Sequence, residues 1–156
     1  MNTQAFQVDR AVAMQTYNEA NADGKVLIKK LLGDADFGKI TDRVKTFDDI
    51  LAIAGKTMEQ LSAGCETPDE IAYRQVKLIA EVYNEGTLLD PMDTEQVKYF
   101  PWFEITPNSG FGLSFCDDAC WHSYSYVGLR LCFKSRELAI DAGKKFTEIY
   151  ANLLIK

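Results

Sequence analysis

The character of the chain changes at about Pro91, and this change constrains the fold more than any other feature. Before it, apolar residues recur three and four apart, which is the spacing of amphipathic helices. After it, residues 97–133 are rich in aromatic and β-branched side chains, which favour strands. A chain of 156 residues has an ordinary size for one domain. The sequence therefore predicts a single α+β domain, 1–156, with a helical part over about 1–90 and a sheet–helix part over about 95–156.

Capping residues predict where the helices of the first part begin. The strongest start is Thr67-Pro68-Asp69-Glu70, because Thr67 can cap the helix, Pro68 suits its first position and the two acids suit the helix dipole. This helix should end near Asn84. Further helices are predicted over 3–22, where residues 21–24 mark the end, over 25–32, from Thr46 to Gly55 and at Thr57, with a loop over 34–41.

Three short strands are predicted in the second part, over 97–105, 111–116 and 125–133. Pro101 favours an edge or a bulge in the first of them. Short connections between consecutive strands favour an antiparallel meander, with a polar and aromatic connection over 117–124. Ser135 can cap one last helix, whose apolar stripe should cover the sheet. The predicted fold is thus N-terminal helices, a three-stranded antiparallel meander and a C-terminal helix packed on it.

The charge distribution argues against several classes of function. The net charge is −6; residues 1–94 hold 10 basic and 16 acidic side chains, and residues 95–156 hold seven of each. A protein that binds duplex nucleic acid needs a basic stripe, and a membrane-surface protein needs a polybasic one. The first ten residues lack the features of a signal peptide, and no apolar run has the length of a spanning helix. These observations predict a cytoplasmic protein with reduced cysteines, which binds neither duplex nucleic acid nor a membrane.

Two cysteines and the histidine lie close together in the sequence, as Cys116-x3-Cys120-x-His122, with Cys132 further along the chain. Thiolates and imidazole are zinc ligands, but the usual Cys-x2-Cys spacing is missing. Cys–His catalysis would need a carboxylate to orient His122 and an oxyanion hole, of which only the carboxylate is available from the neighbouring aspartates. A strand-end cysteine and a loop cysteine near an exposed histidine is the simpler interpretation. We expect no catalytic residue, metal or cofactor, and a small Cys/His-dependent or metal enzyme is the weaker alternative.

Aromatic side chains offer a candidate binding surface in the second part. Both faces of the predicted strands carry large apolar groups, so that one face needs cover from the N-terminal helices or another subunit. A protein partner, with a second copy of the chain as one candidate, fits such a surface. Single-stranded nucleic acid or a nucleotide, stacked on the aromatics, is the alternative, although Glu104 and the acids at 117–118 oppose it. The predicted surface residues are Phe100, Trp102, Trp121, His122, Tyr124, Tyr126, Arg130 and Lys134.

Three segments of the chain are distinctive: 127–146 (VGLRLCFKSRELAIDAGKKF), 99–104 (YFPWFE) and 40–47 (ITDRVKTF). Together they resemble an uncharacterised family of small proteins encoded by phages and integrated mobile elements of gut bacteria. The similarity covers most of the chain after residue 15 and keeps the order of the segments. The resemblance implies a cytoplasmic accessory protein of a phage or mobile element, and it implies no activity and no catalytic residues. With the aromatic surface, it predicts a non-enzymatic interaction protein.

Overall fold

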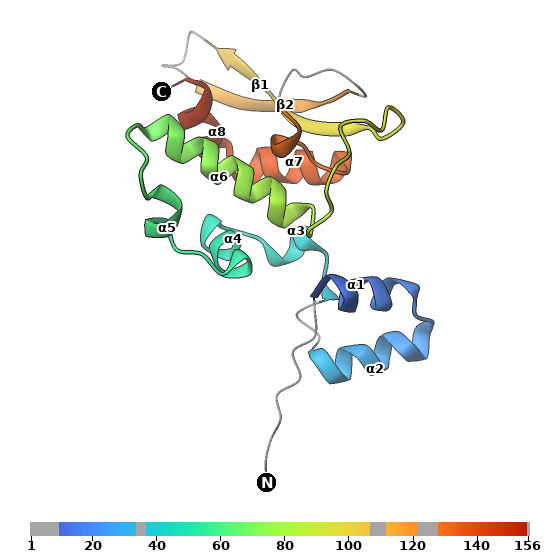
Figure 1. Ribbon diagram of the computed structural model, residues 1–156. Helices are drawn as coiled ribbons and strands as arrows, with labels where there is room; N and C mark the ends of the chain where they lie inside the picture. Colours follow the sequence, from blue (N-terminus) through green and yellow to red (C-terminus); the bar gives the residue numbers. More distant parts are fainter. Residues whose placement is uncertain (1–9, 34–36, 107–111, 122–127, 156) are drawn as a thin grey trace. The chain divides into compact units, whose positions relative to one another are not determined.

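The computed structural model describes residues 10–33, 37–106, 112–121 and 128–155 (Figure 1). The chain divides into two compact units, residues 1–43 and 44–156. The first holds the helices α1 (Arg10–Glu19), α2 (Ala22–Leu32) and α3 (Ile40–Arg43). The prediction that all 156 residues fold as one domain stays a prediction.

Residues 21–24 begin a helix, and the prediction that they only end one is wrong. The Asn21 side chain accepts a hydrogen bond from the Gly24 N–H at 2.9 Å, and this cap starts α2. Gly33, with a φ of 91°, closes the same helix. The predicted loop over 34–41 also needs correction, because α3 begins at Ile40.

The second unit has a layer of helices beneath a β-hairpin (Figure 1). Its elements are α4 (Phe47–Ala54), α5 (Met58–Ser62), α6 (Pro68–Tyr83), β1 (Lys98–Thr106), β2 (Gly112–Trp121), the 3-10 helix η3 (Leu129–Leu131), α7 (Arg136–Lys145) and α8 (Thr147–Leu154). Helices α7 and α8 contact the hairpin, and α6 contacts α4, α5, α8 and η3. Helix α6, from the part before residue 90, therefore packs directly on elements from the part after residue 95.

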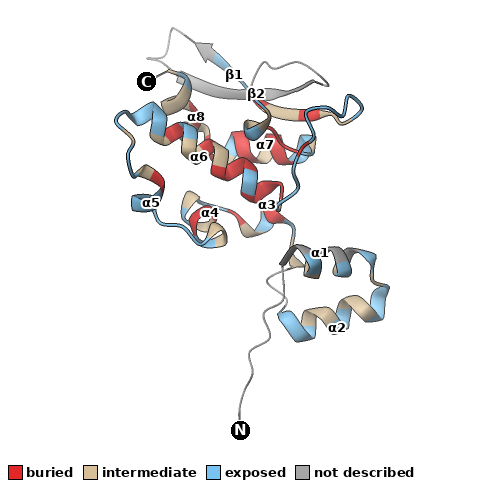
Figure 2. Ribbon diagram, viewed as in Figure 1, coloured by how far each residue is buried: buried red, intermediate tan, exposed pale blue. Residues whose placement is uncertain are grey.

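Helix α6 runs through the middle of this unit and carries much of its core. Its buried residues recur along the face that Figure 2 shows in red. At its end, the fully buried ring of Tyr83 meets the ring of Phe133 edge-on at 5.8 Å and that of Phe146 at 6.2 Å. Edge-to-face contacts of this kind add to the stabilisation from burial alone. One aromatic side chain thereby joins α6 to the chain on both sides of α7.

The sheet contains two strands among the described residues, and the predicted α+β fold with a three-stranded meander is wrong. Strands β1 and β2 pair antiparallel, and the described chain is mainly helical. Residues 117–121, predicted as part of a connection, continue β2. The segment predicted as a third strand contains η3 and makes one isolated bridge, between Phe133 and Tyr99; residues 125–127 of that strand lie outside the described residues.

Backbone hydrogen bonding explains why this bridge does not grow into a strand. Tyr99 and Phe133 exchange both of their backbone hydrogen bonds, at 3.1 and 2.7 Å. The next pair of this kind would join residues 101 and 131, two positions further along each segment. Pro101 has no N–H to donate, and Leu131 belongs to η3. In the other direction the segment ends at Ser135, which caps α7.

The far side of the same segment is occupied by a side chain. The buried Asn84 follows α6, donates from Nδ2 to the Cys132 carbonyl at 2.9 Å and accepts at Oδ1 from the Lys134 N–H, also at 2.9 Å. Its amide group thus pairs with the extended backbone much as a neighbouring strand would. We call the two contacts of Asn84 with residues 132–134, together with the Tyr99–Phe133 bridge, the amide clamp.

The single C-terminal helix of the sequence prediction is two helices, α7 and α8. The break falls at Phe146, whose φ and ψ of −115° and 26° are not helical. The Thr147 hydroxyl donates to the Gly143 carbonyl at 2.8 Å, and so takes the acceptor that the backbone N–H of residue 147 would use in a continuous helix. Phe146, at this break, is the residue whose ring meets that of Tyr83.

Asn84→Leu should lower the free energy of unfolding by about 2–4 kcal/mol, because it leaves the buried Cys132 carbonyl and the partly buried Lys134 N–H without their partner. Asn84→Asp should be at least as harmful, since a carboxylate can accept from Lys134 but repels the carbonyl. Chemical denaturation measures both. Asn152→Leu on α8 is the control and should change stability little. Equal stability of Asn84→Leu and the parent protein would contradict the amide clamp.

Candidate functional site

The structure brings together two of the eight predicted surface residues on β1. Phe100 and Trp102 lie two residues apart on this strand, with ring centroids 6.4 Å apart. Trp121 is the last residue of β2, and its side chain is not among those described. His122, Tyr124 and Tyr126 lie outside the described residues. Arg130 lies exposed on η3, and Lys134 follows the bridge residue Phe133.

The two aromatics lie on the hairpin face that points away from the helices. Side chains alternate along a strand, so that Phe100, Trp102 and Glu104 share one face. On the other face, the ring of Phe103 lies 4.9 Å from that of Tyr150 on α8. Trp102 keeps 55% of its surface exposed, which is unusual for so large an apolar side chain. We call Phe100, Trp102 and Glu104 the outer hairpin face.

A β-bulge lies beside this face. Trp102 pairs with Asp117 and Phe103 pairs with Phe115, so Cys116 is the extra residue on β2. Bulges increase strand twist and interrupt the ladder locally. The sequence prediction ended the second strand at this cysteine and missed the five residues of β2 beyond it. The edge or bulge that Pro101 predicts in the first strand has its counterpart in this register shift between Trp102 and Phe103.

Lys134 is engaged in structural contacts. Its Nζ lies 3.1 Å from the Asn84 carbonyl oxygen and 3.7 Å from Glu85 Oε2. Glu85 has a positive φ of 52°, in the turn that ends α6. The ammonium group therefore helps to hold a strained turn, and its charge is partly neutralised there.

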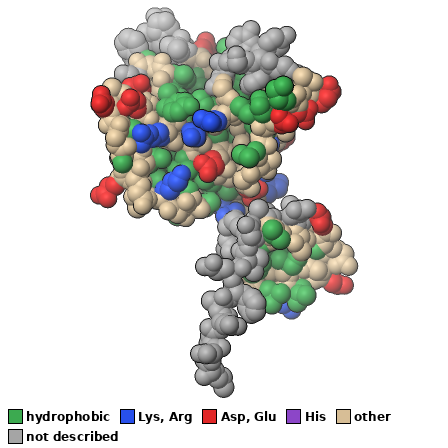
Figure 3. Space-filling model, viewed as in Figure 1, with side chains coloured by type: hydrophobic (Ala, Val, Ile, Leu, Met, Phe, Trp, Pro, Cys, Tyr) green, Lys and Arg blue, Asp and Glu red, His purple; other side chains and the backbone are tan. Residues whose placement is uncertain are grey.

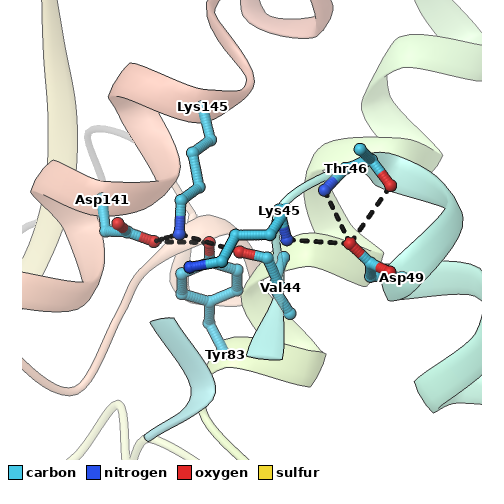
Figure 4. Close-up of polar contacts among 7 residues, drawn as sticks. All are labelled: Val44, Lys45, Thr46, Asp49, Tyr83, Asp141 and Lys145. Atoms are coloured by element: carbon cyan, nitrogen blue, oxygen red, sulfur yellow. Dashed lines mark hydrogen bonds and ion pairs between the residues drawn. The ribbon is translucent and has the colours of Figure 1, made fainter. Parts of the chain in front are cut away.

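A partly buried polar network joins α6, α7 and the segment before α4, and the sequence prediction missed it (Figure 4). The Tyr83 hydroxyl donates to Asp141 Oδ2 at 2.7 Å. Lys145 Nζ donates to the same oxygen at 2.7 Å and to the Val44 carbonyl at 2.8 Å. Burial, and then the hydrogen bond to Asp141, raise the pKa of Tyr83 above its ordinary value. The Tyr83 side chain is fully buried, and the side chains of Lys145 and Asp141 keep 21% and 26% of their surface exposed.

Another buried hydroxyl, that of Tyr150, has no hydrogen-bond partner among the described residues. Burial raises the pKa of this tyrosine as well. Its ring packs on Phe103, as described above. The geometry assigns Tyr150 to the core beneath the hairpin.

A cleft of about 560 Å³ lies elsewhere, between the end of α4, α5 and α6. Arg74, one of its three basic residues, donates from its guanidinium to the carbonyls of Leu61 and Ala63, at 3.0 and 2.7 Å. The described lining contains no histidine, cysteine or hydroxyl side chain. The lining residues are Ala54, Gly55, Lys56, Gln60, Leu61, Arg74, Lys77, Leu78 and Glu81.

The cysteines and the histidine give no centre that the structure can describe. Cys132 is buried and Cys65 is partly exposed, and neither is in a disulfide. No group of three His, Cys, Asp or Glu residues within the described ranges is placed to hold a metal ion. The zinc and Cys–His hypotheses depend on the side chains of Cys116 and Cys120 and on His122, which are not described, and stay hypotheses.

Comparisons with protein-family models, with curated proteins and with solved structures found no match to this chain. None of the helices in the described part of the chain has the length and apolar character needed to cross a membrane.

Tyr83→Phe should lower the free energy of unfolding by about 1–3 kcal/mol at neutral pH, because it removes a hydrogen bond to the Asp141 carboxylate and keeps the ring. The raised pKa also has a pH consequence. The stabilisation of the fold that comes from the raised pKa of Tyr83 is fully present below the unfolded pKa of about 10. It is lost as the pH rises above that value. Denaturation at pH 8 and above should therefore show a shallower alkaline decline for the variant. An unchanged alkaline decline would contradict this assignment.

Asp49→Asn should flatten the acid limb of the stability curve. Hydrogen bonds from the backbone N–H groups of Lys45 and Thr46, each 2.8 Å long, lower the pKa of Asp49 (Figure 4). A lowered pKa stabilises the fold above the unfolded value of about 3.9, and the effect is lost as the pH falls through the folded value. The neighbouring Asp48→Asn is the matched control. An equal loss of stability with falling pH in both variants would contradict the assignment.

Proposed function

We propose that this protein is a non-enzymatic interaction protein, which binds another protein through the outer hairpin face. The observation that carries the proposal is the Phe100–Trp102 pair, with Trp102 55% exposed on a strand whose other face is packed. The resemblance to small phage and mobile-element proteins is the ground for proposing a cytoplasmic accessory role.

The surroundings of the pair suit an interface. Tryptophan is enriched among the residues that dominate binding energy, because it buries a large area at a small entropic cost. The inner face of the hairpin packs on α7 and α8, and the amide clamp joins β1 to the end of α6. A partner would therefore meet aromatics that are already held in place, which reduces the entropy lost on binding.

Charge indicates the chemistry of the partner. Glu104 is exposed on the same face as Trp102, and the whole chain carries a net charge of −6. An apolar pocket bordered by lysine or arginine would complement an aromatic anchor with a carboxylate beside it. We infer that the partner protein presents such a pocket.

Base stacking on the same aromatics is the alternative, and the neighbouring charges disfavour it. Such binding needs cations that track the phosphates. On β1, Lys98 is fully buried and its ammonium binds the Asp93 carbonyl. Arg130 and Lys134 are both exposed, but the Lys134 ammonium is paired with Glu85 and its charge is partly neutralised there.

Site-specific photo-crosslinking tests the proposal. A photoreactive amino acid at position 102 should capture a discrete protein from bacterial host cells that carry the phage or mobile element. The same group at position 73, where Tyr73 is 42% exposed on α6, is the matched control and should capture none. Alanine at position 100 should reduce capture at position 102 several-fold, because it removes the neighbouring ring.

The crosslinked product separates the two functions. A protein adduct specific to position 102 supports the proposal. A nuclease-sensitive adduct would contradict it and favour single-stranded nucleic acid. Equal capture at positions 73 and 102 would also contradict it, since the outer hairpin face would then have no special role.

A further inference from the structure

The helical hairpin of α1 and α2 has no core of its own among its described side chains. None of the 11 residues of α2 is buried, and none of the described side chains of α1 is buried either. The exposed fractions of Leu27 and Leu31 are 59% and 73%. Very small units usually need oligomerisation or a covalent or metal staple to supply what a small core cannot.

Helix α2 presents its charged side to α1. The ammonium groups of Lys25 and Lys29 lie 5.6 and 5.9 Å from the centroid of the Tyr17 ring, in cation–π geometry. The Tyr17 ring in turn lies 4.7 Å from that of Phe37. Since these lysines occupy the side that faces α1, Leu27 and Leu31 lie on the other side of the helix, and apolar side chains are visible at the surface of this unit (Figure 3).

The exposed side has the spacing of a short coiled-coil seam. Gly24, Leu27 and Leu31 follow each other at three and four residues, as positions a, d and a of a heptad do. Asp23 and Lys30 each precede an a position, and therefore both occupy g, on the same flank of the seam. Both are exposed. The flank thus carries one negative and one positive charge, about 10 Å apart along the helix axis.

We propose that α2 pairs with α2 of a second copy of this chain, in antiparallel orientation. In this register Leu27 of each helix packs against Gly24 of the other, and Leu31 lies at each end of the seam. In an antiparallel pair, g positions face g positions, so that Asp23 of each helix meets Lys30 of the other and two equivalent ion pairs form. In a parallel pair, Asp23 would face the e position, which is Ile28 and offers no charge.

The same charges favour a second copy over a membrane surface. Helices that lie on membranes carry several cations beside their apolar face. Two of the three lysines of α2 are turned toward Tyr17, and the exposed flank has no net charge. The interface is also isologous and closed by a two-fold axis, which is the commonest arrangement of soluble oligomers. Because the seam is short, the association should be weak and visible at high micromolar concentration.

Sedimentation equilibrium of the full chain over a range of concentrations tests the proposal. The parent protein should show a reversible monomer–dimer equilibrium, and Leu27→Asp should abolish it. Val26→Asp is the matched control: Val26 is 53% exposed on the same helix but lies outside the seam, and the variant should dimerise like the parent protein. Trp102→Ala should also leave the dimer intact, which separates this contact from the outer hairpin face.

A charge swap tests the orientation. Asp23→Lys alone should weaken dimerisation about tenfold, because it replaces two attractions with two repulsions. Adding Lys30→Asp to the same chain should restore it. A chain that stays monomeric at all concentrations would overturn the proposal, as would a double variant that remains as weak as the single one. Binding of a monomeric chain to vesicles of phosphatidylglycerol and phosphatidylcholine, lost in Leu27→Asp, would overturn it in favour of a membrane surface.

Discussion

The hydrogen bonds between the Asn84 amide and the backbone of residues 132–134 are the constraint on which the second unit depends. They fix Phe133, whose backbone binds Tyr99 of β1 and whose ring packs on Tyr83. The hairpin is thereby tied to the end of α6. Its inner face then packs on α7 and α8, and its outer face is left to carry Phe100 and Trp102. A side-chain amide thus lies along the outer edge of the segment that the sequence predicts as a third strand.

Local chemistry explains what could be predicted from the sequence. The helices α4, α5 and α6 begin after Thr46, Thr57 and Thr67, and α7 begins after Ser135, as their capping residues predict. Pro101 correctly indicates the edge of a strand. Because it has no N–H to donate, it also helps to prevent the segment around Phe133 from pairing further along β1. The alternating pattern over 125–133 favours a strand, but it cannot show that Asn84, 48 residues away, provides the partner.

Features that depend on distant residues could not be predicted. The Tyr83–Asp141 contact spans 58 residues and the Lys145–Val44 contact spans 101, and neither has a local pattern. In α2, the spacing of apolar residues predicts a helix but not its rotation. The rotation depends on the lysines that lie over Tyr17, and these leave Leu27 exposed. Phe100 and Trp102 are predicted as surface residues, because large apolar groups on both faces of the strands leave one face to be covered by something other than the last helix.

Hydrogen exchange at the amide of Lys134 tests the amide clamp most directly. This N–H is bound to a side-chain oxygen in a segment without regular secondary structure, where an unsupported amide would exchange quickly. If the clamp organises the unit, the Lys134 amide should exchange as slowly as the core amides of α6, through opening of the whole unit. Fast exchange of Lys134 and Phe133, with α6 still protected, would contradict the account.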